Sequence, residues 1–165
     1  MSRWSSRPSE ERALLNPSFC SCVLWQAAVG HKSVSQEPLP FDMSFLVLPI
    51  VLHRATRDAL PTTTRTSLAV WIDDNPLVQS RVADRSCMLV QFTKEAMMFG
   101  GLRGVLEFQA GAISANPAWK KSIVADLKDS TDEVRGCMKR AEFVGKWLAI
   151  SGSSSTVMAI FGVRP

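Results

Sequence analysis

The stretch from Phe45 to Pro61, FLVLPIVLHRATRDALP, opens with eight consecutive apolar residues and then turns polar and basic. A membrane-spanning helix needs about 20 apolar residues, so this run is too short to cross a bilayer. We expect a short buried helix that begins near Phe41 and ends or kinks at Pro49, where the ring removes a backbone donor. We expect the apolar half of the stretch to be buried and the basic half, His53–Asp58, to lie at the surface.

Helices are predicted on both sides of this stretch. Asn16-Pro17 is typical of a helix start, with Asn16 as the cap, and apolar side chains then recur at helical spacing as far as Gly30. A linker is expected over residues 31–40. After Pro61, threonines 62–64 provide caps for a helix that ends near Asp74. Asn75-Pro76 begins the next helix.

Beyond Thr93, which has the chemistry of another cap, the pattern predicts a helix over residues 93–103. The period then changes to that of two short strands, 105–108 and 112–114, joined by a turn that contains Gly111. Helix, turn, helix and hairpin together predict a winged helix–turn–helix-like core over residues 64–115. The fold class is therefore mainly α with a small β-hairpin, with further helices flanking this core on both sides.

The C-terminal third is predicted to be helical. Residues 117–130 have a weaker pattern, which we interpret as a loop with a short helix. Asp132 and Glu133 favour a helix start after Thr131. The Ser/Gly-rich stretch 151–155 interrupts the helical segment 131–162. We expect one domain over 1–165, with residues 1–8, which include Trp4, disordered.

The net charge and the spacing of the cysteines limit which classes of function are expected. The 165-residue chain has a net charge of +4, and residues 116–165 hold eight Lys or Arg against five Asp or Glu. Such an excess fits either a solvated helix face or contact with nucleic acid or an acidic partner. The four cysteines have no zinc-ligand spacing. The N-terminus lacks the apolar core of a signal peptide, so we expect a cytoplasmic location and reduced, buried thiols.

No constellation for catalysis is visible in the sequence. There is no phosphate-binding glycine loop and no nucleophile elbow, and His53 has no nucleophile placed beside it. Asp73-Asp74 is interpreted as a helix end. We therefore predict no catalytic residue, no cofactor, no metal ligand and no enzymatic activity.

Two surfaces remain open to more than one interpretation. Residues 93–103 carry Lys94, Glu95 and Arg103 among methionine and phenylalanine, which is too apolar for a helix that reads DNA bases and favours protein contact or core packing. The basic segment at His53–Asp58 is either a solvated helix end with a local Arg57–Asp58 contact or a docking patch.

Three segments, together with Asn16–Cys20, resemble the middle component of bacterial three-component ABC ATPase systems over about residues 16–165. They are LPIVLHRATRDALP at 48–61, FTKEA at 92–96 running to Gly111, and AEFVGKW at 141–147 running to Pro165.

The resemblance implies an adaptor that bridges an SMC/Rad50-like ABC ATPase and an effector, often a nuclease, in Lamassu-like defence against phage or plasmids. Contact with the DNA backbone without sequence preference is a further expectation, and no membrane is implied. The alternative is a winged-helix DNA-binding transcriptional regulator. The residues that we expect to contact a partner or DNA are His53, Arg54, Arg57, Lys139, Arg140 and Lys146.

Overall fold

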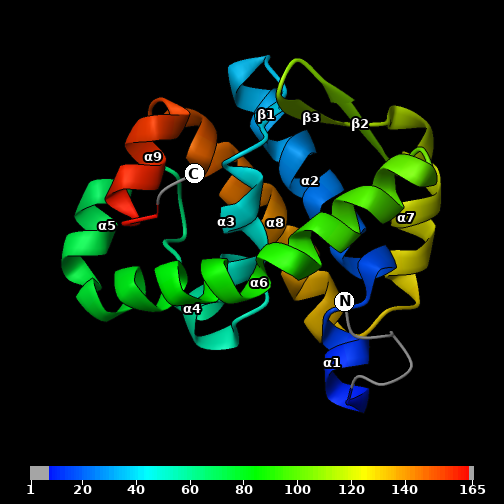
Figure 1. Ribbon diagram of the computed structural model, residues 1–165, viewed down its shortest axis with the longest axis horizontal. Helices are drawn as coiled ribbons and strands as arrows, with labels where there is room; N and C mark the ends of the chain where they lie inside the picture. The colour runs from blue at the N-terminus through cyan, green and yellow to red at the C-terminus, as the bar shows by residue number, and fades with distance from the viewer. Residues whose placement is uncertain (1–7, 164–165) are drawn as a thin grey trace.

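The computed structural model describes residues 8–163, so Trp4 and the rest of the expected disordered segment 1–8, apart from Pro8, lie outside the described part (Figure 1). Its elements, in chain order, are α1 Ser9–Leu14, α2 Pro17–Ser35, β1 Leu39–Pro40, α3 Ser44–Val51, α4 Arg54–Ala59, α5 Leu68–Asp74, α6 Pro76–Leu102, β2 Leu106–Gln109, β3 Ala112–Ala115, the 3-10 helix η2 Pro117–Trp119, α7 Lys120–Lys128, α8 Asp132–Ile150 and α9 Ser154–Ile160. The expected fold class, mainly α with a small β element, is confirmed.

Helix α3, the apolar run, lies at the centre of the molecule. Every residue of α3 except Phe45 is buried, and the helix packs against α2, α6 and α8 (Figure 1). Burial of a continuous apolar segment in this way is the main driving force for folding. The predicted end at Pro49 is wrong, because α3 continues to Val51. Packing on all sides maintains the helix although proline donates no backbone hydrogen bond.

Helices α2 and α8 cross at two glycines. A Cβ at Gly30 would overlap the backbone carbonyl of Glu142, and a Cβ at Gly145 would overlap that of Ala27. Gly30 is therefore a contact position inside α2 and not its end, which corrects the expected linker at 31–35. The helix ends at Gln36, whose φ of 64° is left-handed and stops the helical backbone.

Helix α6 is one continuous helix of 27 residues. Thr93 is wholly buried inside it and is not a cap, so the turn of the expected helix–turn–helix is absent. The inner face of α6 carries small residues, including Ser86, Thr93 and Gly100, which let the helix lie close to the core. Because no glycine or proline occurs between Pro76 and Gly100, nothing in the sequence interrupts the helix.

The predicted hairpin is confirmed, with β2 and β3 antiparallel and Phe108 opposite Ile113. Its turn places Ala110 and Gly111 at φ of 50° and 74°, which is the geometry that suits a two-residue hairpin loop. Strand β1 adds a third strand to β3 within the expected linker. The amide of Phe41 also donates to the carbonyl of Gly111 at 2.9 Å, which brings Phe41 beside the hairpin.

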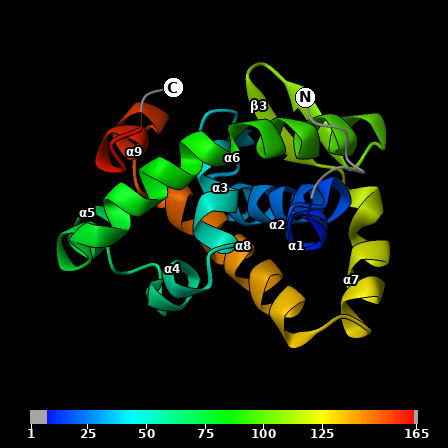
Figure 2. The same ribbon diagram turned by 60° about the horizontal axis from the view of Figure 1, so that its bottom comes forward.

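The C-terminal helices follow the prediction closely. Thr131 caps α8, accepting from the amide of Val134 at 3.3 Å, and α9 begins after Ser153. Residues 117–128 form η2 and α7, which stand beside the hairpin end of the molecule (Figure 2). Across residues 8–163, no helix combines the length and apolar character that membrane crossing requires.

Candidate interaction surfaces

His53 caps the N-terminus of helix α4. Its Nδ1 accepts from the amide of Thr56 at 3.2 Å, so the imidazole acts as the helix cap. Arg54 follows on the exposed side, where its guanidinium lies 3.6 Å from the carboxylate of Asp58. The local ion pair of this segment is therefore Arg54–Asp58, not the expected Arg57–Asp58.

Arg57 is buried, which corrects its assignment to an exposed docking patch. Its side chain is only 5% exposed and forms an ion pair with Glu133. The same guanidinium donates to the carbonyl of Val51 at 2.8 Å and lies 3.1 Å from the sulfur of Cys137. The carbonyls at a helix end lack partners within the helix, and the planar fork of arginine can satisfy one of them while it binds a carboxylate. Arg57 thus joins α3 and α4 to α8.

Two arginines of α6 complete a basic surface around His53. Arg85 donates to the hydroxyl of Thr56 at 2.7 Å and to the carbonyl of Pro49 at 3.1 Å. Burial, followed by the charges of Arg85, Arg81 and Arg57, lowers the pKa of His53 below its ordinary value. The imidazole therefore favours its neutral form, and the lasting positive charge here comes from arginine.

Sequence reasoning missed Arg81 and Arg85. Their spacing of four residues places them on one side of a helix, and this was the only signal available. Burial and the neighbouring Arg81 lower the pKa of Arg85. Only the packing of α6 on α3 brings this pair next to His53, some thirty residues earlier in the chain.

The three basic candidates on α8 have different surroundings. Lys139 is exposed. Arg140 donates to the carbonyl of Pro61 at 3.2 Å and lies over the Phe143 ring, 5.6 Å from its centre. Lys146 pairs with Glu142 one turn earlier, at 2.5 Å. Arg140 and Lys146 are therefore partly engaged within the fold, and Lys139 is the most available of the three.

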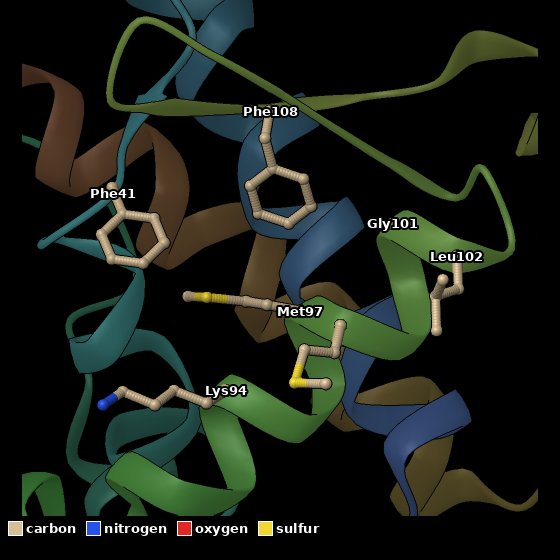
Figure 3. A pocket seen from close by; sticks show the side chains of 7 residues that line it. Phe41, Lys94, Met97, Gly101, Leu102 and Phe108 are labelled. Atoms are coloured by element: carbon tan, nitrogen blue, oxygen red, sulfur yellow. The ribbon is translucent and has the colours of Figure 1, made fainter.

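An apolar groove of about 580 Å³ lies between the C-terminal part of α6 and the hairpin (Figure 3). Its lining residues are Phe41, Lys94, Met97, Met98, Gly101, Leu102 and Phe108. In Figure 3, Phe41 and Phe108 stand above the helix that carries Lys94, Met97 and Leu102. The sequence predicted that this part of the chain would contact protein or pack in the core, and the structure shows Met97 buried but Met98 exposed.

The cysteines divide between core and surface. Cys20 and Cys137 are buried, Cys22 is partly exposed and Cys87 is exposed, so the expectation of burial fails for Cys87. Burial raises the pKa of Cys20 to about 12 and raises that of Cys137, which makes both thiols unreactive at neutral pH. In the described part of the chain, no group of three His, Cys, Asp or Glu side chains is placed to hold a metal ion.

Comparison with known proteins identifies the family of this chain. One family model matches residues 4–165, nearly the whole chain, and describes a component of a multi-protein ABC system. The chain belongs to the family of ABC-three component (ABC-3C) system Middle Component 3. Neither the curated proteins nor the solved structures contain a match.

Proposed function

We propose that this protein is a non-catalytic adaptor that bridges an SMC/Rad50-like ABC ATPase and an effector, often a nuclease, in a bacterial defence complex against phage or plasmids of the Lamassu-like class. The observation that carries the proposal is the family match over residues 4–165, which makes the chain a middle component of an ABC three-component system.

The described surfaces support a binding role. A bridging subunit needs separate contact areas, and the chain presents an apolar groove at one end of α6 and a basic surface around His53 nearer the other end. Exposed apolar grooves are typical of protein–protein contacts, and basic surfaces suit acidic partners or the phosphate backbone of DNA.

The test is reconstitution with the ABC ATPase and the effector encoded beside this gene. We expect all three proteins to co-purify, and we expect the ATPase and the effector to separate when this subunit is omitted. The isolated chain should show no turnover of nucleotide or nucleic acid. A monodisperse monomer that binds neither neighbour would refute the adaptor role.

A further inference from the structure

We propose that the groove between α6 and the hairpin binds an amphipathic helix of a partner subunit, and that this helix carries an acidic residue beside its apolar side chains. The inference deepens the proposed function and rests on it, because it assigns a chemistry and a shape to one of the partner contacts.

Four exposed large apolar side chains meet at this groove. Leu102 is 86% exposed, Met98 59%, Phe108 44% and Phe41 41%, although they come from three separate segments of the chain. Single exposed apolar residues are common on soluble proteins, whereas a contiguous set around one groove marks an interaction site. Methionine suits such a site because its flexible, polarisable side chain adapts to the shape of the bound surface.

The spacing of the lining residues along α6 indicates that the groove binds a helix. Lys94, Met97, Met98, Gly101 and Leu102 recur at intervals of three and four residues, so they form one stripe on the helix surface. Such a stripe is the surface against which another helix packs, with axes about 8–10 Å apart. Gly101 lacks a side chain on this stripe, and a Cβ there would lie 3.0 Å from the ring of Phe108. The glycine thus lets the Phe108 ring approach α6 closely and form a wall of the groove.

Charge complementarity selects an acidic residue on that helix. Lys94 is the one charged side chain that lines the groove, and no ion pair joins it to another residue in the described part of the chain. Every other lining side chain lacks nitrogen and oxygen. A small polar ligand would need several converging polar groups to orient it, which these side chains do not supply. An apolar helix face with one flanking Asp or Glu matches both the lining and the ammonium group.

The test uses the full chain co-expressed with the neighbouring ABC ATPase and effector. We expect Met98→Glu and Leu102→Glu each to weaken binding of one partner at least about tenfold, as truncation of an interface hot spot does. Lys94→Glu should weaken the same contact, whereas Lys94→Met should weaken it less. Met88→Glu is the matched control, because Met88 lies on the same helix outside the groove and is 66% exposed.

A photo-crosslinking residue placed at position 98 identifies the occupant. We expect crosslinks to one peptide of a partner that has apolar residues at helical spacing and an Asp or Glu beside them. Crosslinks only to a second copy of this chain, or to a peptide without an acidic residue, would overturn the inference. If assembly stays at the wild-type level in Met98→Glu and Leu102→Glu, the inference is overturned and the adaptor role stands. The same holds if Met88→Glu weakens assembly as much as they do. Failure of the wild-type chain to bind either neighbour would overturn both.

Discussion

Two arginines three positions apart in the same short helix illustrate how much the surroundings of a residue matter. Arg54 is exposed and its contact with Asp58 is of the surface kind that contributes little to stability. Arg57 is buried, and its guanidinium contacts Val51, Cys137 and Glu133. The same residue type is therefore an exposed charge in one case and a structural link between three helices in the other.

Replacement of Arg57 should destabilise the folded protein and leave the exposed charged residues at other positions unchanged. Arg57→Met leaves the carbonyl of Val51 and the carboxylate of Glu133 without their donor, and we expect a loss of about 2–3 kcal/mol in the free energy of unfolding. Urea denaturation measures this loss. Arg54→Met is the control and should change stability by less than about 0.5 kcal/mol. Equal effects of the two substitutions would show that the Arg57 contacts do not stabilise the fold.

His53 should contribute a pH dependence to stability. The pKa of His53 is lower in the folded protein than in the unfolded chain. The imidazole therefore binds a proton more tightly in the unfolded chain, and a falling pH favours unfolding. The stability that the neutral imidazole contributes is present above the unfolded pKa of about 6.5 and is lost as the pH falls through the folded pKa. His53→Asn keeps a capping acceptor but does not titrate. We expect its free energy of unfolding to decline less than that of the wild type from about pH 7 to about pH 5; parallel profiles would contradict this.

At the scale of elements, two of the three wrong predictions about helix ends, those at Gly30 and Thr93, share a cause. Gly30 and Thr93 both resemble end signals, but each lies inside a helix that continues for several residues. Gly30 allows α2 to touch the backbone of α8, and Thr93 faces the core. Small residues therefore serve here to bring helices together rather than to stop them.

The crossing of α2 and α8 gives a sharp test of this interpretation. Gly30→Ala places a methyl group against the backbone carbonyl of Glu142, so the helices must separate, and we expect a loss of about 3 kcal/mol or more. Gly136→Ala on α8 is the control, because an added Cβ there has no atom within 4 Å apart from the neighbouring backbone of its own helix. That variant should be more stable than the wild type by about 0.5–1 kcal/mol. Thermal unfolding distinguishes the two; stabilisation by both substitutions would mean that the crossing is not close.

At the scale of the whole molecule, the two exposed basic candidates, Arg54 and Lys139, lie on different elements from the apolar groove. Arg54 lies on α4 and Lys139 on α8, whereas the groove lies between α6 and the hairpin. Exposed charges act over a Debye length of about 8 Å in physiological salt and mainly accelerate encounter, while buried apolar contacts determine how long a complex persists. The two kinds of surface should therefore affect assembly differently.

Charge reversal at the exposed basic residues should slow assembly. We expect Arg54→Glu combined with Lys139→Glu to reduce the association rate several-fold at low salt, with a smaller difference as salt screens the charges. Binding kinetics with the purified ATPase and effector, and with duplex DNA, measure the effect on each partner. Lys128→Glu on α7 is the control for a single added acid on another exposed face. No difference between these variants would assign Arg54 and Lys139 to solvated helix faces.

The sequence by itself determined much of the secondary structure. The Leu46–Leu52 run had to be buried because it is continuously apolar, Asn16 and Thr131 had to cap helices because their side chains accept backbone hydrogen bonds, and the Ala110-Gly111 turn had to join two strands. These are local properties, set by neighbours within a few residues.

Only the tertiary structure decided which charges stay outside and where a partner can bind. Arg57 becomes internal because Glu133 and Cys137, nearly eighty residues later, meet it, and His53 gains Arg81 and Arg85 only through the packing of α6. The groove likewise requires Phe41, Met98 and Phe108 to converge from three separate segments of the chain. Burial and pairing depend on contacts between distant segments, whose geometry no local pattern specifies.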